Sequence, residues 1–422
     1  MTSGIDANEV AKHLRPGMTV FVAGATAEPA VILDALRRDP GCCAGIRFVS
    51  APIPGINNVD FSAFHKDCQS TAFFATPGNR DAIASGRVDF VPMQYRSIFD
   101  YLAEDFCFDL VLAQLPPPGD DGRFSLGVCA DFLPAVLDNA KLLIGEINTQ
   151  QPLPPDSPTW PTSRLDMTID CDQPVGNIPE ATIDQAASDI GRHVSEIIND
   201  GDCIQVGIGS VPNAILAALK GKNDLGIHSG LVSDGVMALA SAGNINGKNK
   251  SVDMGRIVTG TTLGSRQLID WAGSDPQLSF RSVGYTHDVG VIRQLDNFVS
   301  INSAMEVDLF GQINADMLQG RQQSGTGGAI DMMRSASLSR GGRSIVALKA
   351  TATGGTSSRI VAALSRNTAA TILRTDVDYV VTEYGARRIR HLAIDARANA
   401  LAEIAAPQFR DDLRKDWASL AN

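Results

Sequence analysis

One segment of the sequence occurs twice, at an offset of 184 residues (Val10 matches Val194), and this repeat constrains the fold more than any other feature. The two copies are residues 9–36, EVAKHLRPGMTVFVAGATAEPAVILDAL, and residues 193–219, HVSEIINDGDCIQVGIGSVPNAILAAL. Each copy predicts a helix, a glycine turn, a short apolar strand, a glycine-containing loop and a second helix that begins at the proline. Because this spacing is too long for a solenoid, the repeat predicts two domains of the same α/β kind.

A proline-rich segment separates the two copies. Seven of the 21 prolines fall within residues 152–179, which excludes a helix or a central strand there. They are Pro152, Pro154, Pro155, Pro158, Pro161, Pro174 and Pro179. A helical pattern resumes over residues 183–199, so we expect an N-terminal domain at residues 1–185 and a C-terminal domain at residues 186–422.

Six further apolar runs predict strands. They are residues 46–49, 110–114, 142–147, 298–301, 344–348 and 379–382. These runs alternate with helical or glycine-rich segments, which is typical of open, mainly parallel sheets covered by helices. The expected architecture is therefore two related open α/β/α domains. Ligands of such sheets bind at the carboxyl ends of the strands.

Charge and cysteine content exclude several classes of protein. The 422 residues carry a formal charge of −11, with 47 acidic and 36 basic side chains and no long basic run, so we expect no nucleic-acid or anionic-membrane partner. Seven cysteines without CxxC spacing predict reduced thiols, no metal site and a cytoplasmic location. No export signal and no apolar run long enough to cross a membrane is visible.

The first candidate binding loop is the turn GIGSVP in the second copy of the repeat, with Gly207, Ile208 and Gly209. Its glycines allow backbone N–H groups to approach an anion or an oxyanion at the start of a helix. The loop lacks the third glycine of the dinucleotide fingerprint. A purely structural turn is the alternative interpretation.

Three more glycine-rich loops follow within residues 324–359. They are SGTGGA at 324–329, SRGGRS at 339–344 and TATGGTSSR at 351–359, and they alternate with Arg340, Arg343, Lys349 and Arg359. This locally basic, amide-rich region of an acidic chain suits a phosphate-bearing ligand. Ordinary tight turns with solvated charges would give the same pattern.

Candidate acid and base groups are scattered. His228 and His287 are candidate general bases because a free imidazole titrates near neutrality, although a single histidine is more often structural. Glu28, which precedes the proline of the first repeat loop, is a candidate buried carboxylate. The acids of SAMEVDLFGQ and TEYG are interpreted as structural.

In their order along the chain, these segments resemble the acetyl-CoA hydrolase/CoA-transferase family, which includes 4-hydroxybutyrate and butyrate–acetate CoA-transferases. The resemblance covers nearly the whole chain. It is carried by AEP at 27–29, PPPGDDGRFSLG at 116–127, IGEIN at 144–148, VGIGSVPNAIL at 206–216, DLGIHSGLVSDGV at 224–236, SAMEVDLFGQINAD at 303–316, QSGTGGAIDMMRSASLSRGGRSIVAL at 323–348 and VTEYGARRIR at 381–390.

The resemblance implies two α/β domains with the active site between them, and a cytoplasmic homodimer. It implies acyl-CoA and a small carboxylic acid as substrates, with coenzyme A held by the glycine-rich region. The implied CoA-binding residues are Gly325, Gly327, Gly328, Arg343, Lys349, Gly354 and Gly355. Amides of the loop 207–209 would then face the thioester or acyl oxygen.

One position departs from the family pattern in a way that affects the chemistry. Family transferases carry a glutamate after the IHS segment, which attacks acyl-CoA and becomes a glutamyl-CoA thioester, whereas this chain has Gly230. A glycine cannot perform covalent carboxylate catalysis. Nearby, Gly284 stands where many members have Glu, His287 replaces an Asn and Ala329 replaces a Gln.

Three hypotheses follow. The favoured one is a hydrolase of a small or ring-derived acyl-CoA, which attacks with a water activated by His287, Glu28 or His228; hydrolytic carbon–carbon cleavage in an acyl-CoA is a variant. The second is CoA transfer through another carboxylate, for which Glu28 is the nominated acid. The third is a non-catalytic acyl-CoA-binding protein. The segments 116–127 and 228–236 are expected to set the acyl pocket.

Overall fold

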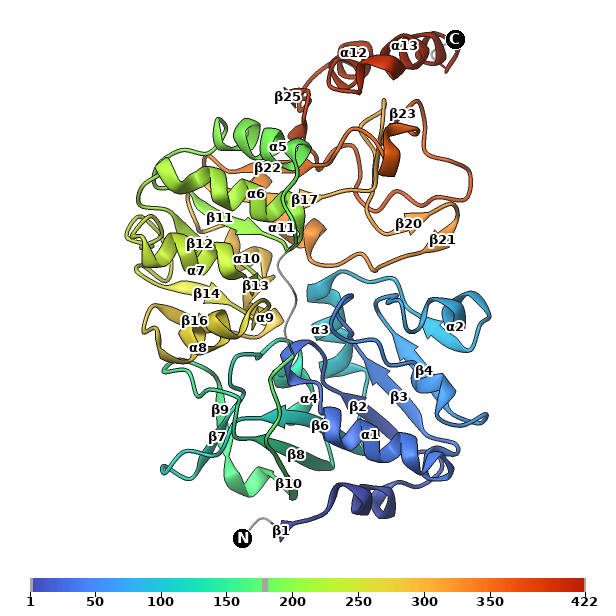
Figure 1. Ribbon diagram of the computed structural model, residues 1–422, viewed down its shortest axis with the longest axis vertical. Helices are drawn as coiled ribbons and strands as arrows, with labels where there is room; N and C mark the ends of the chain where they lie inside the picture. Colours follow the sequence, from blue (N-terminus) through green and yellow to red (C-terminus); the bar gives the residue numbers. More distant parts are fainter. Residues whose placement is uncertain (1–2, 177–180, 421–422) are drawn as a thin grey trace.

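The computed structural model describes residues 3–176 and 181–420, and these residues form two large sheets that lie at different ends of the molecule (Figure 1). The N-terminal sheet has the order β1-β10-β8-β6-β2-β3-β4-β5, and every pairing in it is parallel. Its strands are β1 Ser3–Gly4, β2 Thr19–Val22, β3 Arg47–Ser50, β4 Gln69–Ala72, β5 Val88–Phe90, β6 Leu110–Leu115, β8 Leu142–Asn148 and β10 Met167–Cys171.

The C-terminal sheet has the order β16-β14-β12-β11-β17-β22-β24-β25, parallel except for the edge pair β24 and β25. Its strands are β11 Cys203–Val206, β12 Gly226–His228, β14 Ile257–Thr259, β16 Leu278–Phe280, β17 Phe298–Ser303, β22 Arg343–Ala347, β24 Tyr379–Thr382 and β25 Gly385–Arg388. Smaller sheets pair β13 Leu231–Val232 with β15 Thr261–Thr262, β7 Arg123–Ser125 with β9 Thr159–Pro161, β20 Met317–Leu318 with β21 Arg321–Gln322, and β18 Glu306–Asp308 with β19 Ile313–Asn314 and β23 Ile360–Val361.

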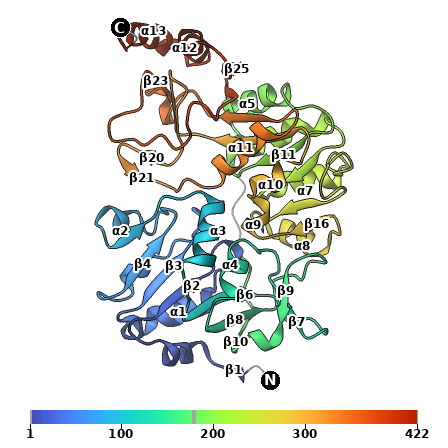
Figure 2. The same cartoon turned by 180° about the vertical axis from the view of Figure 1, so that it is seen from behind.

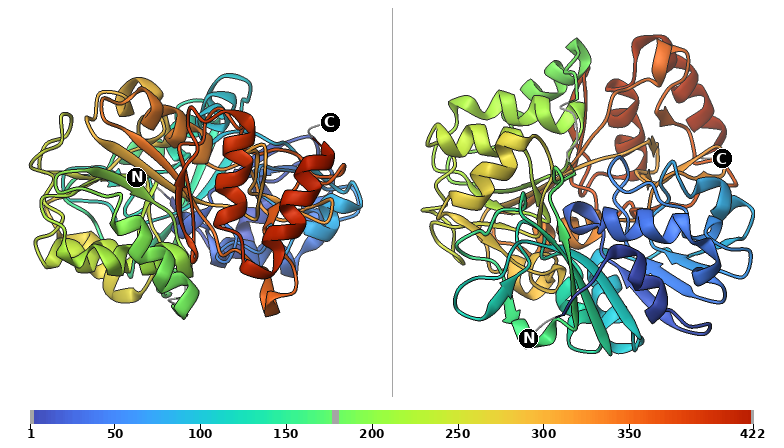
Figure 3. Two further views of the ribbon diagram at one scale, coloured as in Figure 1. Left: turned by 90° about the horizontal axis from the view of Figure 1, so that it is seen from above. Right: turned by 60° about the horizontal axis from the view of Figure 1, so that its bottom comes forward.

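Helices cover both large sheets, as apolar strands buried on both faces require. In the N-terminal half they are α1 Ala30–Arg38, α2 Arg80–Ala84, α3 Tyr95–Glu104 and α4 Leu133–Leu137. In the C-terminal half they are α5 Gln185–Ser195, α6 Ser210–Ala218, α7 Asp234–Ser241, α8 Arg266–Ser274, α9 Val283–Thr286, α10 Val289–Ile292, α11 Ala329–Leu338, α12 Ile394–Glu403 and α13 Arg410–Leu420. Figure 3 shows α12 and α13 side by side near the C-terminus, where they contact each other.

The internal repeat is visible in the topology. If β2 is matched to β11, then β3, β4 and β5 match β12, β14 and β16 on one side, and β6, β8, β10 and β1 match β17, β22, β24 and β25 on the other. In each sheet the strand order reverses at the matched central strand, which places a topological switch point there. The predicted α/β fold with two mainly parallel sheets is therefore confirmed, and all six predicted strands are present with ends shifted by one or two residues.

Three details of the repeat differ from the prediction. The first helix of copy one is a 3₁₀ helix, η1 Ala7–His13, capped by Asp6. In copy two, α6 begins two residues before Pro212, because Gly209 adopts a left-handed φ of 114° and turns the chain early. The helix predicted over 183–199 is shorter, and Asp184 caps it by accepting from the Ala187 N–H at 3.0 Å.

One hydrophobic cluster joins the two halves. It contains Phe21 and Phe132 from the N-terminal half and Ile204 and Val283 from the C-terminal half, all nearly fully buried. Helices α3 and α9 meet in this region (Figure 2). Since apolar burial stabilises in proportion to the area removed from water, this shared core fixes the site between the sheets.

The remaining expectations are placed as follows. The boundary at 185/186 stays a prediction, and it falls in the first turn of α5, which connects β10 to β11. Residues 177–179 of the proline-rich segment lie outside the described residues. The cysteines are free thiols. Within the described ranges, no helix is long and apolar enough to cross a membrane, and no cluster of His, Cys, Asp or Glu is arranged to hold a metal.

Candidate active site

A cavity of about 390 Å³ lies between the two sheets, at the carboxyl ends of β11, β12 and β17. Both halves of the chain contribute to its wall. The N-terminal half supplies Ile53, Pro54, Phe74, Tyr95 and Asp131, and the C-terminal half supplies residues 205–208, 229–231, 302–303 and 324–329, with Thr261, His287, Ala315 and Met332. This is where a ligand is expected in an open parallel sheet, beside a switch point.

The loop 207–209 places backbone N–H groups that have no hydrogen-bond acceptor among the described residues at this cavity. Gly207 and Ile208 line it, and Gly209 begins the turn into α6. Within the described ranges, the N–H groups of residues 207–209 donate to no other group. Such amides at a helix start can stabilise a developing oxyanion.

His287 fills the space beside Gly230. A Cβ built on Gly230 would lie 2.6 Å from Cε1 and 3.0 Å from Nε2 of His287, and one built on Gly328 would lie even closer to the same ring. Since van der Waals contacts between heavy atoms are about 3.5–4.0 Å, a side chain at either glycine and the imidazole exclude one another. The absence of a side chain at position 230 is therefore linked to the presence of His287.

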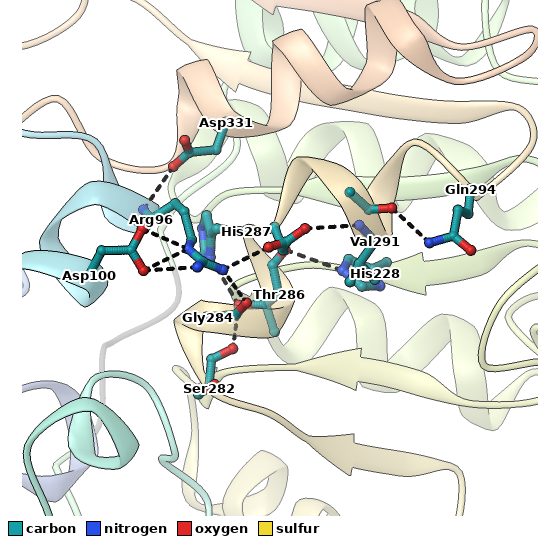
Figure 4. Close-up of polar contacts among 12 residues, drawn as sticks. Arg96, Asp100, His228, Ser282, Gly284, Thr286, His287, Val291, Gln294 and Asp331 are labelled. Atoms are coloured by element: carbon teal, nitrogen blue, oxygen red, sulfur yellow. Dashed lines mark hydrogen bonds and ion pairs between the residues drawn. The ribbon is translucent and has the colours of Figure 1, made fainter. Parts of the chain in front are cut away.

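Hydrogen bonds fix the orientation of the His287 ring (Figure 4). Its Nδ1 lies 2.9 Å from the Thr286 hydroxyl, which donates to the Ser282 carbonyl at 3.2 Å. This arrangement assigns the proton to Nδ1 and leaves a lone pair on Nε2, next to the two glycines. Burial lowers the pKa of His287 to about 3, so the imidazole is neutral.

His228 lies behind this segment and does not line the cavity. Its ring is fully buried, and Nε2 donates to the Thr286 carbonyl at 3.2 Å. Burial, with Lys250 nearby, lowers its pKa to about 3. The structure thus gives His228 a positioning contact with the backbone that carries His287, rather than access to substrate.

Arg96 ties the His287 segment to the N-terminal half (Figure 4). From α3 its guanidinium donates to the Gly284 carbonyl at 2.6 Å and to the Asp288 carboxylate at 2.7 Å, while Asp100 holds it on its own helix. Its backbone N–H donates to Asp331 on α11 at 3.1 Å. Gly284 has no room for a side chain, because a Cβ would lie 2.7 Å from the Phe99 ring.

Asp131 is a cavity residue that the sequence analysis missed. It is 6% exposed, and its carboxyl has no hydrogen-bond partner among the described residues. Burial raises its pKa to about 7. The sequence carries a signal that could have indicated it, since this acid stands inside the apolar run VCADFLP.

Glu28 is partly buried and lies outside the wall of this cavity. It sits at the carboxyl end of the N-terminal sheet, near Asn57 and Glu146, and burial raises its pKa to about 7. The acids interpreted as structural do have structural partners. Glu306 accepts from Asn314, Asp308 from Gln312, and Glu383 from the Ala350 N–H.

A second cavity of about 230 Å³ adjoins the first and shares Ile208 and Ser303 with it. Its wall includes Gly209, Lys349 and Arg359, which makes it basic. Lys349 forms an ion pair with Asp184 at 2.6 Å, whereas no partner of the Arg359 guanidinium is found among the described residues. This cavity can hold an anionic group next to the loop 207–209.

The predicted CoA-binding residues separate into three groups. Gly325, Gly327 and Gly328 line the first cavity and Lys349 lines the second. Gly354 and Gly355, both with positive φ, form the tight turn η7 Thr353–Gly355, outside both walls. Arg343 lies at the amino end of β22, where its guanidinium pairs with Asp202, at the opposite edge of the sheet from the cavities.

Two family models match most of the chain. The acetyl-CoA hydrolase/transferase N-terminal domain matches residues 3–156, and the corresponding C-terminal domain matches residues 264–417. The chain belongs to the acetyl-CoA hydrolase/transferase family. The expected α/β architecture with two mainly parallel sheets is that of its solved structures.

Individual relatives are similar over most of their length. The 4-hydroxybutyrate coenzyme A transferase of Clostridium kluyveri is 34% identical over 98% of this chain and 96% of its own. The succinyl-CoA:cyclohexane-1-carboxylate CoA transferase of Geobacter metallireducens is 34% identical over 81% of this chain and 78% of its own. The crystal structure of RipA from Yersinia pestis superposes with a TM-score of 0.94, at 28% identity, over 99% of this chain and 98% of that one.

These comparisons do not support the preference for hydrolysis. An acetyl-CoA hydrolase from Neurospora crassa matches at 23% identity over 70% of the chain, well below the CoA-transferases. The chain is an acyl-CoA enzyme of this family, and CoA transfer is better supported than the hydrolysis that the sequence favoured.

Proposed function

We propose that this protein is an acyl-CoA:carboxylate CoA-transferase. The observation that carries the proposal is the pair of adjoining cavities, in which a pocket suited to an acyl group meets a basic pocket beside the N–H groups of residues 207–209, which donate to no other group among the described residues. The thioester oxygen would face these amides, and Lys349 and Arg359 would bind phosphate groups of coenzyme A. The transferase relatives support this assignment.

The first cavity suits a small acyl group. Its wall combines apolar side chains, among them Ile53, Phe74 and Leu231, with hydroxyl groups such as Ser229 and Thr261. Its volume must also admit the thiol end of coenzyme A, which leaves space for a short or ring-derived acyl chain.

Gly230 is part of the proposal. We infer that it occupies the position that family transferases give to their catalytic glutamate, and that His287 fills the vacated space. A side chain added at position 230 would collide with the His287 ring. Exchanging a glutamate for Gly230 therefore involves at least residues 230 and 287. Transfer must then use a different carboxylate.

Hydrolysis remains the second candidate because His287 offers a lone pair at Nε2 beside Gly230. A water held there could attack the thioester carbon. The weakness of this route is the low pKa of the buried imidazole, about 3, since so weak a base removes a proton from water inefficiently.

Thioester turnover with and without an acceptor tests the proposal. Purified protein would be incubated with short, branched, hydroxy, keto and cyclic acyl-CoAs, with free thiol followed by a thiol reagent and new acyl-CoAs by mass spectrometry. We expect a new acyl-CoA only when acetate or another small carboxylate is present. Thiol release without acceptor would favour hydrolysis, and CoA binding without any turnover would favour a binding protein.

The domain boundary at 185/186, the homodimer and the cytoplasmic location belong to the same proposal. Light scattering after size-exclusion chromatography would give twice the chain mass for a dimer. A monomer with full activity would remove the dimer from the proposal.

A further inference from the structure

CoA transfer by double displacement needs an enzyme carboxylate, and position 230 provides none. Among the described residues that line the first cavity, Asp131 alone carries a carboxyl group. We propose that Asp131 is the nucleophile that receives and passes on the acyl and CoA groups. This inference rests on the proposed CoA transfer.

Asp131 is anchored next to Gly230 by backbone hydrogen bonds. The Gly260 carbonyl accepts from the N–H groups of Ala130 at 2.9 Å and Asp131 at 3.3 Å. In turn the N–H groups of Gly260 and Thr261 donate to the Gly230 carbonyl, both at 3.1 Å. One residue therefore bridges Asp131 to the position of the missing side chain, and both face the same cavity.

The backbone of Asp131 is held in a definite, uncommon conformation. Its φ of 32° is in the left-handed region, which aspartate and asparagine tolerate better than most residues. Its carbonyl accepts from the Val283 N–H at 2.9 Å, a contact from the opposite half of the chain. The conformation is thus fixed by both halves, at a residue that lines the cavity between them.

The surroundings leave this carboxyl reactive. It forms no ion pair and no side-chain hydrogen bond among the described residues, and its neighbours Cys129 and Phe132 are buried while Tyr95 is partly buried. A carboxylate without such partners is weakly solvated and keeps its lone pairs available. The raised pKa has the same origin, since burial is its sole cause.

The chemical steps balance as follows. The Asp131 carboxylate attacks the thioester carbon, the C–S bond breaks, and an acyl-aspartyl anhydride and CoA thiolate form. The thiolate attacks the aspartyl carbonyl of the anhydride, which gives aspartyl-CoA thioester and the free carboxylate of the donor acyl group. An incoming carboxylate then attacks aspartyl-CoA to form a new anhydride and thiolate, and attack of that thiolate on the acyl carbon releases new acyl-CoA and restores Asp131.

Trapping the aspartyl-CoA thioester tests the inference directly. Wild-type protein would be incubated with an acyl-CoA that it turns over, treated with hydroxylamine and digested with trypsin. Cleavage after Arg123 and Lys141 gives the peptide FSLGVCADFLPAVLDNAK, which contains Asp131 and Asp138 as its acidic residues. We expect the hydroxamate on Asp131, and only after exposure to acyl-CoA.

Matched variants separate a catalytic role from a structural one. Asp131→Asn keeps the shape and tolerates the left-handed φ, and it should lower the transfer rate at least about a thousandfold and abolish the label. Asp138→Asn, which changes the exposed acid of the same peptide, should retain both rate and label. The label on the wild-type protein remains informative even if Asp131→Asn folds poorly.

The outcomes distinguish this inference from the proposed function. CoA transfer with the label on another peptide, or transfer retained by a folded Asp131→Asn protein, would overturn the role of Asp131 and leave the function intact. Thiol release that requires Asp131 but gives no trapped adduct would make it a base for water and refute the nucleophile. Absence of any acceptor-dependent transfer by the wild-type protein would remove the proposed function itself.

Discussion

The contact between position 230 and His287 predicts a measurable coupling. In Gly230→Ala the new Cβ would lie 2.6 Å from Cε1 of His287, far inside van der Waals distance. The ring has little space to withdraw, because Gly328 faces its neighbouring edge and the Tyr95 ring centroid is 4.9 Å away. Its hydrogen bond to Thr286 also resists displacement.

The expected magnitude follows from two opposing effects. Overpacking a closed site costs about 1–3 kcal/mol. The backbone at Gly230 is not in the left-handed region, so replacing glycine there also restricts the unfolded chain and returns about 0.4–1 kcal/mol. In the wild-type background we therefore expect a net loss of about 1–2 kcal/mol, whereas with His287→Ala only the gain remains.

Urea unfolding of four proteins measures this coupling: wild type, Gly230→Ala, His287→Ala and the double variant. The interaction energy should be about 1–3 kcal/mol, well above the deviation of about 0.3–0.5 kcal/mol seen for independent sites. Gly221→Ala is the control, since a Cβ there meets open space and should show no coupling to His287. Equal effects of Gly230→Ala in both backgrounds would refute the steric link.

Three further predictions concern Asp131, the basic cavity and the contact between the halves. Burial raises the folded-state pKa of Asp131 to about 7, so its contribution to stability is complete below about pH 4 and is lost as the pH rises through 7. Between pH 4 and pH 8 the stability of Asp131→Asn relative to wild type, measured by urea unfolding, should therefore increase by up to about 4 kcal/mol. A difference that stays constant with pH would contradict this. Arg359→Ala should raise the KM for acyl-CoA about tenfold with little change in kcat, and the increase in KM should be smaller at high salt. Arg340 pairs with Asp296 away from both cavities, so the control Arg340→Ala should leave the KM unchanged. Arg96→Ala should lose about 1.5–3 kcal/mol of stability with its charged hydrogen bonds, and Arg96→Lys should be intermediate; a neutral Arg96→Ala would show that this contact does not hold the halves together.

The sequence was sufficient for the repeat and the strands because both are local patterns. The repeat spacing, the turn glycines and the prolines at helix starts predicted the strands of the two sheets and the helices beside them. Arg343 shows a signal that was present but not applied: it precedes an apolar strand, so it belongs at the amino end of the sheet, away from a site at the carboxyl ends.

The cavity residues were harder to predict because burial is a property of distant segments. Asp131 becomes an unpaired carboxyl only where Tyr95 and Thr261 close around it, and neither is near it in the chain. His228 and His287 looked equivalent as single histidines. Only the folded chain places His228 behind the cavity wall and His287 in the wall itself.

The matched strand order has a consequence for the two loops that begin at the switch points. In the second copy the amides of residues 207–209 stay open, whereas in the first copy the Asn57 side chain accepts from the Ala25 N–H at 2.8 Å and donates to the Ala25 carbonyl at 3.2 Å. In the first loop a side chain of the protein itself therefore satisfies the backbone N–H. The matching amides of the second loop remain available to an oxygen atom of a ligand, so the two related loops differ in whether they can bind one.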